Sequence, residues 1–210
     1  MKNFKVEILR LRYPLRKSER MGRTVEGYVA QHYRKKGYSV LSSRKTDIWN
    51  GRREIDYGTF FRGYPDFITV EKSFIEEDLE RWKRHLNENK NDKIKTNVWI
   101  NEKQLTKKEL KEKINERLKM ISGTIDDPSV QKEINEKYKD IYEKLRVSHR
   151  NQVKQLTKIS LDNGKPDLFV FNKREIFFCE VKSHNDSWSR NQAEWFIKNN
   201  NFPYVLLFIV

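Results

Sequence analysis

The sequence predicts an α/β fold, in which a mixed sheet flanked by helices is joined to a long, mostly helical insertion. The last third of the chain alternates two apolar runs, PDLFVF and IFFCEVK, with an amphipathic stretch, WSRNQAEWFIKNN, and ends on the apolar run FPYVLLFIV. Residues 61–160 are rich in charge and carry narrow apolar stripes, which is typical of solvated helices. Without that segment the elements follow the order helix, strand, strand, strand, helix, strand, which indicates a sheet covered by helices.

The N-terminal part is expected to supply the first helix and strand of this core. Residues 18–36 predict a helix with apolar residues at helical spacing, and Gly37 is a natural end for it. YSVLSS at 38–43 predicts a strand, and Asn50-Gly51 predicts a two-residue hairpin turn. The acidic residues beside that turn are expected to be surface charges paired with arginines: Asp47, Glu54 and Asp56.

The insertion, residues 61–160, is expected to separate the two parts of the core, residues 1–60 and 161–210. A short strand is predicted at 94–100. The two helices that follow carry single apolar stripes and are joined by a short loop around Gly123, so they predict an antiparallel helical arm. Capping patterns predict the helix starts: Ser73 with Glu76, Thr106 with Glu109, and Asp127 with Pro128.

Composition restricts the class of partner and the compartment. Lys and Arg number 44 against 30 Asp and Glu, which gives a formal net charge of +14 and a pI near 9.7. This excess favours a polyanion such as nucleic acid, although a lysine-rich soluble protein would show it too. The single cysteine, Cys179, excludes an internal disulfide and a cysteine-rich zinc site. The longest apolar run, VLLFIV, is too short to span a membrane, and the charged N-terminus is unlike a secretory signal. We therefore expect a soluble intracellular protein, cytoplasmic or nucleoid-associated.

The stretch 164–183 predicts a hairpin that brings two acidic side chains together. If its turn is centred on Lys173-Arg174, the numbers of paired residues sum to 347, and Asp167 then lies opposite Glu180. Their Cβ atoms would be about 5 Å apart, and Lys182 would share their face of the sheet. A four-residue loop, NKRE, would preserve this register, whereas a slip of one residue would place the two carboxylates on opposite faces.

Two facing carboxylates repel each other unless a positive charge lies between them. A hard divalent cation such as Mg²⁺ suits oxygen ligands, and a lysine beside it would stabilise charge on a phosphate or orient a bound water. On a basic protein, these groups are suited to hydrolysis of phosphodiester bonds. The residues alone leave a simpler interpretation open, in which all three are strand-end charges and Lys182 neutralises Glu180.

The pattern at 164–198 resembles a known family. The spacing D-x12-E-V-K, after a helix that contains a glutamate, resembles the PD-(D/E)xK nucleases. More narrowly it resembles the VRR-NUC family, which includes the Fanconi-associated nuclease and small phage junction-cutting enzymes. The resemblance rests on these positions: Gly164, Pro166, Asp167, Leu168, Glu180, Val181, Lys182, Asn185, Asp186, Ser189, Gln192 and Trp195.

The resemblance implies a restriction-endonuclease-like core with the order α-β-β-β-α-β. It also implies a Mg²⁺- or Mn²⁺-dependent DNA endonuclease that acts on branched, flapped or four-way DNA. The metal ligands would be Asp167, Glu180 and Glu26. Lys182 would be the catalytic lysine, and Gln192 would lie near the metal or the scissile phosphate. Ordinary roles stay open for two of these, since Glu26 borders an apolar helix stripe and Gln192 fits a capping box. A homodimer is a further possibility, because symmetric cutting of a junction needs two sites.

Two observations limit the resemblance. The long helical segment is absent from small members of the family, which leaves the substrate open. GYPDFITVEKS at 63–73 repeats the start of the motif, but Glu71 and Lys72 are adjacent and would point to opposite faces of a strand. We therefore expect a strand or loop there, and we favour Asp167 over Asp66 as the metal position. Three functions remain: the DNA endonuclease, a nucleic-acid-binding module with a silent nuclease-like core, and a restriction-type or RNA-directed nuclease with the same site.

Overall fold

The computed structural model describes seven segments of the chain: residues 4–10, 23–43, 55–88, 93–96, 103–159, 164–183 and 186–210. The chain forms two compact units. The first unit comprises residues 1–45, 55–62 and 139–210, and the second comprises residues 46–54 and 63–138. Residues 139–159 therefore belong to the first unit, whereas we expected them in the insertion.

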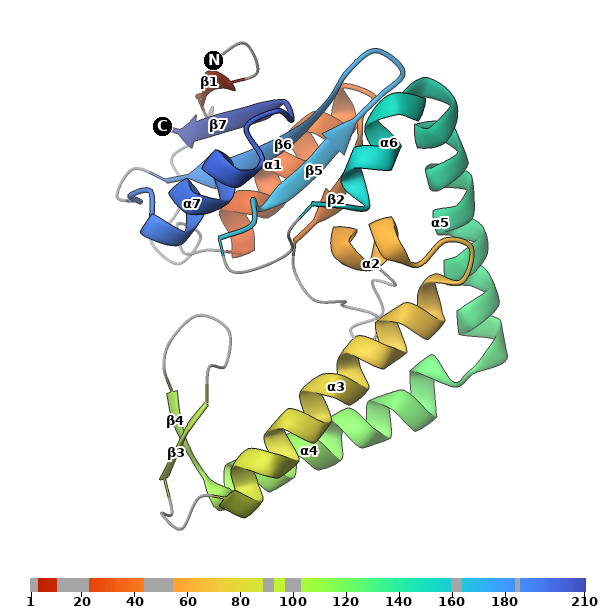
Figure 1. Ribbon diagram of the computed structural model, residues 1–210, viewed down its shortest axis with the longest axis vertical. Coiled ribbons are helices and arrows are strands. Elements are labelled where there is room, and N and C mark those ends of the chain that lie inside the picture. The colour runs from red at the N-terminus through yellow and green to blue at the C-terminus, as the bar shows by residue number, and fades with distance from the viewer. Residues whose placement is uncertain are drawn as a thin grey trace. The chain divides into compact units, whose positions relative to one another are not determined.

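Within the described residues, five strands form a mixed sheet in the order β1-β7-β6-β5-β2 (Figure 1). β6 runs parallel to β7 and antiparallel to β5, which in turn pairs antiparallel with β2. The predicted mixed sheet is confirmed. The strands are Phe4–Leu9 (β1), Ser39–Ser42 (β2), Leu168–Phe171 (β5), Ile176–Lys182 (β6) and Tyr204–Ile209 (β7).

The edge strand β1 is an addition to the predicted order. It pairs in parallel with β7, with Phe4 opposite Tyr204. Apolar and charged residues alternate in FKVEI, which is a strand signal, but the usual burial is inverted. Val6 and Ile8 are exposed, whereas Glu7 is half-buried. Pairing with the backbone of β7 and apolar contacts at its two ends place β1 in the sheet. Phe4 packs on Phe196 at a centroid distance of 5.2 Å, and Leu9 packs against the buried cluster of the α1 face.

The helices α1 (Arg23–Lys35) and α7 (Arg190–Lys198) cover opposite faces of this sheet. Val29 of α1 shares a buried cluster with Cys179 of β6. The preceding residue, Phe178, instead contacts Trp195 of α7, with ring centroids 5.1 Å apart. Successive strand residues point to opposite faces, so these two contacts place one helix on each side.

The α7 face also carries α2 (Tyr57–Arg62), the end of α5 (Pro128–Ser148) and α6 (Arg150–Leu156). Phe61 of α2 packs on Phe169 of β5 at a centroid distance of 4.8 Å, and Phe60 packs on Tyr142 of α5 at 5.5 Å. These aromatic contacts explain why residues 139–159 join the core. The hairpin predicted around Asn50-Gly51 lies outside the described residues.

The second unit contains two long helices joined through a small hairpin. Its elements are α3 (Phe67–Glu88), β3 (Lys93–Thr96), β4 (Lys103–Thr106), α4 (Lys107–Met120), a π-helical turn (Ile121–Ile125) and the start of α5. The predicted capping box of Thr106 and Glu109 is confirmed. The start predicted at Ser73 is wrong, because α3 already begins six residues earlier. There Asp66 Oδ1 accepts a hydrogen bond from the Thr69 amide at 3.1 Å.

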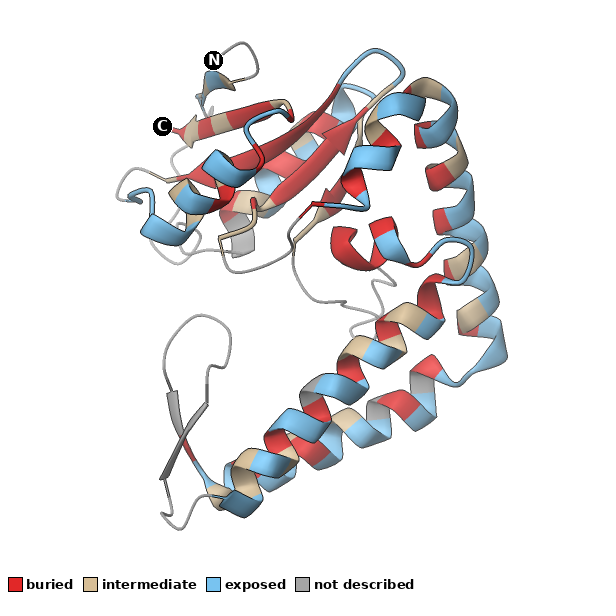
Figure 2. Cartoon of the chain, viewed as in Figure 1, coloured by how far each residue is buried: buried red, intermediate tan, exposed pale blue. Residues whose placement is uncertain are grey.

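The partner of α4 also differs from the prediction. We expected α4 and α5 to form an antiparallel arm, but α4 packs along α3, where the Arg117 guanidinium lies over the Trp82 ring at 5.8 Å. Figure 2 shows buried residues along one side of both helices and exposed residues along the rest. Although α3 has 22 residues and α5 has 21, no described helix is long and apolar enough to cross a membrane.

Candidate active site

The hairpin of β5 and β6 has the predicted register. Leu168 pairs with Cys179 and Phe171 with Ile176, so paired numbers sum to 347. The NKRE loop is stabilised by Asn172, whose side-chain oxygen accepts hydrogen bonds from the amides of Arg174 at 2.7 Å and Glu175 at 3.0 Å. The side chain therefore satisfies turn donors that a Lys-Arg turn leaves open.

Asp167 lies directly before β5, at the position that the β5–β6 register places opposite Glu180. Its backbone carbonyl accepts a hydrogen bond from Ser43 at 2.8 Å, which continues the β2–β5 pairing by one residue. Its side-chain Oδ2 accepts a hydrogen bond from the Val181 amide at 2.9 Å. The Asp167 carboxylate is thus fixed beside β6, next to Glu180, the residue that the register places opposite it.

Glu180 is almost completely buried, with 1% of its surface exposed. Its Oε1 accepts hydrogen bonds from Lys182 Nζ at 2.9 Å and from Gln192 Nε2. Its Oε2 is buried and has no hydrogen-bond partner among the described residues. Burial raises the pKa of Glu180 to about 8, and the charge of Asp167 adds to this rise, while Lys182 opposes it.

Lys182 and Gln192 complete a small hydrogen-bonded network around this carboxylate. Lys182 Nζ donates to Gln192 Oε1 at 2.9 Å, as well as to Glu180. Gln192 Oε1 also accepts from the Ser189 amide at 2.9 Å, and the Gln192 amide donates to Ser189 Oγ at 3.3 Å. The predicted capping box is therefore confirmed, and the same glutamine contacts both site residues.

Glu26 belongs to α1, the helix that packs on the other face of the sheet. It lies in the first turn of α1, next to the buried Val25, and its side chain is half-buried. Its charge is a smaller contribution to the raised pKa of Glu180. The structure therefore brings Asp167, Glu180, Lys182 and Gln192 into one cluster, with Glu26 within electrostatic range.

A second set of residues, to which we had assigned no role in the site, holds the segment before Asp167. Asp56 is buried, caps α2 through a hydrogen bond from the Gly58 amide at 2.6 Å, and pairs with Lys165 Nζ at 2.7 Å. The Tyr57 hydroxyl donates to the Pro166 carbonyl at 2.9 Å. The prediction that Asp56 is a surface charge is therefore wrong. An acidic residue directly before the apolar run YGTFF was the available signal for a helix cap.

Gly164 fixes the start of the same segment against α7. Its φ is +91°, a conformation that favours glycine, and a Cβ there would overlap the carbonyl oxygen of Asn191. The close approach brings the segment that leads to Asp167 against the first turn of α7, which carries Gln192. Residues 184 and 185 lie outside the described part of the chain, so the family position Asn185 has no structural counterpart here.

The segment that repeats the motif has a different role. Asp66 caps α3 and also accepts a hydrogen bond from Asn135 Nδ2 at 3.1 Å. Hydrogen bonding by Thr69 lowers the pKa of Asp66, the opposite of the shift at Glu180. The expected strand or loop is a helix from Phe67 onward. Asp66 belongs to a helix cap, and the structure gives no reason to assign a metal to it.

The donor set around Glu180 suits a hard divalent cation. Two carboxylates face each other, one of their oxygens is buried without a partner, and the pKa of Glu180 is raised because its negative charge is poorly compensated. Among the described residues, no group of three or more His, Cys, Asp or Glu side chains is arranged closely enough to hold a metal ion. The fit therefore rests on Asp167 and Glu180, with Glu26 farther away.

Comparison with known proteins points to one family. The sequence matches the VRR-NUC domain over residues 99–206. The fold is similar to paFAN1 in its crystal structure with 1nt 5'flap DNA with gap, at 16% sequence identity and a TM-score of 0.41, covering 98% of this chain and 38% of that one. A second paFAN1 crystal structure, with 2nt 5'flap DNA with gap, gives 18% identity and a TM-score of 0.39, covering 97% and 37%. The chain thus spans little more than a third of the solved protein. The comparison with curated proteins found no match.

The family match covers more than half of the chain and includes the whole Asp167–Gln192 cluster. The chain belongs to the VRR-NUC domain family of PD-(D/E)xK nucleases.

Proposed function

We propose that this protein is a metal-dependent DNA endonuclease that hydrolyses phosphodiester bonds in branched or flapped DNA. One observation carries the proposal: a buried glutamate with a raised pKa and an unpartnered oxygen faces an aspartate and contacts a lysine. A strand-end charge pair does not require this arrangement, because both groups would be better solvated at the surface. Strongly perturbed carboxylates of this kind are typical of functional sites.

The proposed metal is Mg²⁺ or Mn²⁺, held by Asp167 and Glu180 with a supporting role for Glu26. Such an ion keeps several waters and needs only one or two protein carboxylates, which agrees with the donor set. When bound, it would supply charge stabilisation at the phosphate and an acidified water. Among the described residues, the Oε2 of Glu180 is the oxygen that Lys182 and Gln192 leave available. Asp167 would bind the ion from beside it, at the position where its Oδ2 accepts the Val181 amide.

Lys182 and Gln192 supply the remaining chemistry from the protein itself. The Lys182 ammonium has three N–H donors, and among the described residues it uses two of them, on Glu180 and Gln192. The third is available to a phosphate oxygen, where it would stabilise the negative charge that develops during attack. Gln192 orients the lysine and, through its cap to Ser189, ties that orientation to the start of α7.

The proposed substrate class follows from charge and family. The net charge of +14 favours a polyanion, and the paFAN1 structures contain 5' flap DNA. A restriction-type or RNA-directed nuclease would use the same site on another substrate. A protein that only binds nucleic acid would keep the hydrogen bonds among Glu180, Lys182 and Gln192 but would not cleave phosphodiester bonds.

The test is a substrate panel of linear, flap, fork and four-way DNA, with a matched RNA duplex, each in Mg²⁺ and in EDTA at identical salt. We expect metal-dependent cleavage of flap or branched DNA at catalytic enzyme levels. Glu180→Gln and Lys182→Ala should each reduce the rate at least about 100-fold while DNA binding persists. Full activity of either variant would refute the mechanism, and preferred cleavage of RNA would move the substrate to the alternative class. Symmetric cutting of the four-way junction would support a homodimer.

A further inference from the structure

The end of α5 and the helix α6 form a basic surface that is separate from the carboxylate cluster. Every charged residue from 144 to 159 is Lys or Arg. Acidic and basic residues are mixed along α4, as is usual for a solvated helix face. Lys144 and Arg146 pair with acidic residues of the preceding turn, Asp140 and Glu143. The remaining cations of the run favour a polyanion as their partner.

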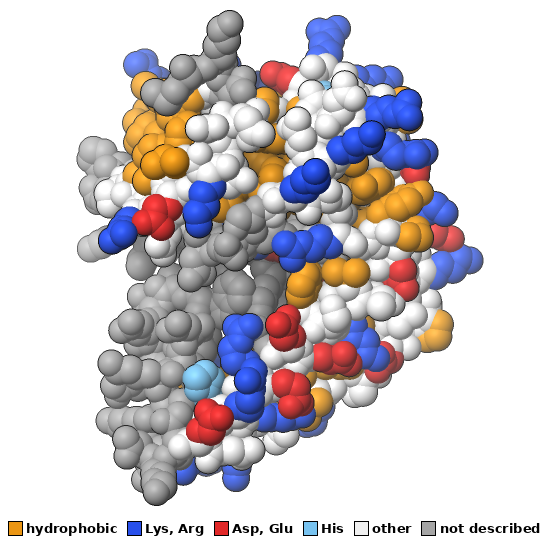
Figure 3. Space-filling view, viewed as in Figure 1, with side chains coloured by type: hydrophobic (Ala, Val, Ile, Leu, Met, Phe, Trp, Pro, Cys, Tyr) orange, Lys and Arg blue, Asp and Glu red, His pale blue; other side chains and the backbone are white. Residues whose placement is uncertain are grey.

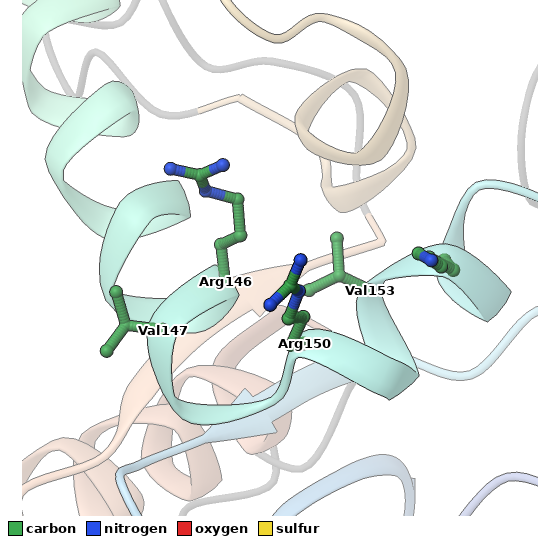
Figure 4. Close-up of a pocket in the computed structure, with 5 residues that line it drawn as sticks. Arg146, Val147, Arg150 and Val153 are labelled. Carbon is green, nitrogen blue, oxygen red and sulfur yellow. The ribbon is translucent and has the colours of Figure 1, made fainter.

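Part of this run surrounds an open hollow of about 520 Å³ (Figure 4). Its lining residues are Arg146 and Val147 from α5, and Arg150, Val153 and Lys154 from α6. We call these five residues the α5–α6 patch. The figure shows the Arg146 and Arg150 side chains extending in the same direction from the two helices. In Figure 3, Lys and Arg side chains gather over this corner of the first unit.

The three cations of the patch, Arg146, Arg150 and Lys154, are exposed and accessible to a ligand. Within the described residues, Arg150 and Lys154 form no ion pair. Arg146 pairs with Glu143 at 2.8 Å, but its side chain is 60% exposed. Such a surface pair contributes little, so a phosphate can replace it. The described lining has no aromatic ring, which a single strand would need for base stacking. The chemistry therefore favours the phosphate backbone of a duplex.

The position of the patch relates it to the active site. His149, between Val147 and Arg150, has its Nε2 2.6 Å from the Asn172 carbonyl, at the end of β5 opposite Asp167. The patch helices lie on the α7 face, which is also the face to which Glu180 points, because Glu180 and Phe178 alternate together on β6. Five residues of strand span about 17 Å. That length of duplex axis is about half a helical turn, or five base pairs, and carries about ten phosphates.

We propose that the α5–α6 patch binds the backbone of a duplex arm about half a turn from the phosphate that is cut. This inference rests on the proposed function, since it assumes that DNA occupies the Asp167–Glu180 site. The inference specifies that the protein holds a duplex arm of the substrate, and it gives the distance between that contact and the phosphate that is cut. Phosphate contacts of this type position a duplex without reading its sequence.

The test compares the triple variant Arg146→Gln, Arg150→Gln, Lys154→Gln with a matched control, Lys108→Gln, Lys111→Gln, Lys119→Gln. The control removes the same charge from exposed positions on α4. Binding of a 5' flap substrate is measured by fluorescence anisotropy in EDTA, over a series of salt concentrations. We expect the patch variant to bind about 10- to 100-fold more weakly, with the salt slope reduced by about 2 to 3, and the control to bind as the wild type does.

A second series shortens one duplex arm at a time. The deficit of the patch variant should disappear when the contacted arm is shorter than about five base pairs, because no phosphate then reaches the patch. Equal binding and equal salt slopes for patch variant and wild type would overturn the inference, as would a deficit seen only on single strands. Wild-type protein that binds through the patch but does not cut DNA would refute the proposed nuclease and leave the patch in place.

Discussion

Replacing Glu180 by glutamine should stabilise the metal-free protein, by an amount that grows with pH. In the fold the pKa of Glu180 is raised to about 8 from an ordinary value of 4.5, first by burial and then by Asp167. Below pH 4.5 the carboxyl is protonated in both the folded and unfolded states, so it costs nothing. As the pH rises toward 8, the unfolded state loses its proton first, and the free energy of unfolding of the wild type falls. Glutamine remains neutral and can keep Oε1 as an acceptor for Lys182, so the variant avoids this loss.

The magnitude follows from the separation of the two pKa values. At pH 7 the pH lies roughly 2.5 units above the pKa of the glutamate in the unfolded chain, which corresponds to an upper value of about 3 to 4 kcal/mol. We therefore expect the variant to exceed the wild type by about 2–3 kcal/mol at pH 7, by somewhat more at pH 8–9, and by less than 1 kcal/mol at pH 5. A large part of the stability of a typical domain is thus lost at pH 7 because the fold keeps this buried carboxyl protonated while the unfolded chain ionises it.

The assay is urea unfolding in EDTA at pH 5, 6, 7, 8 and 9, followed by circular dichroism. The control is Glu194→Gln, which removes an α7 glutamate that is 48% exposed and paired with Arg190. That substitution should change stability by less than about 0.5 kcal/mol at every pH. Added Mg²⁺ should restore stability to the wild type and have little effect on the Glu180→Gln variant, because a ligand stabilises only the state that binds it. A stability difference that does not change with pH, or that favours the wild type at pH 8, would contradict the burial argument.

Two further substitutions test the segment that presents Asp167. Gly164→Ala should lower the free energy of unfolding by at least about 2 kcal/mol and reduce DNA cleavage, because its Cβ would overlap the Asn191 carbonyl at a positive φ; unchanged urea midpoints and rates would contradict the close approach. Tyr57→Phe removes the buried hydrogen bond to the Pro166 carbonyl and should cost about 1–2 kcal/mol in the same unfolding assay, whereas a cost near zero would mean that the bond does not hold this segment.

The core of the site could be predicted because side chains alternate between the two faces of a strand, so the register of a hairpin decides which residues face each other. Once the hairpin turn was centred on Lys173-Arg174, the register placed Asp167 opposite Glu180, and the paired strands have that register. The capping pattern of Ser189 and Gln192 is equally local, since it needs only the spacing of two residues on one helix. Local geometry was therefore enough to predict the residues that the sheet contributes, Asp167 and Glu180, and the cap that places Gln192 on α7.

The rest of the site depends on contacts between residues far apart in the sequence. Asp56 and Lys165 are separated by 109 positions, and no local pattern pairs them. The segment 139–159 has the composition of the helical insertion, yet His149 contacts the β5–β6 turn and Tyr142 packs on α2. The same limit applies to α4, whose apolar stripe predicted a helical partner without determining which helix. A stripe fixes the face of a helix that is buried, and the neighbour that buries it is set by the whole chain.

Gln192 has two roles, because it caps α7 and also contacts Glu180 and Lys182, and only the second role requires glutamine rather than glutamate. A capping box accepts either glutamate or glutamine at its third position, so the start of α7 alone does not distinguish them. The cluster does, because Gln192 donates to Glu180 through Nε2 and accepts from Lys182 through Oε1. A carboxylate could accept from the lysine but could not donate to Glu180, and it would add a third negative charge beside a group whose pKa is already raised. An amide supplies one donor and one acceptor at no charge, and it places the lysine relative to the buried carboxylate while it begins the helix.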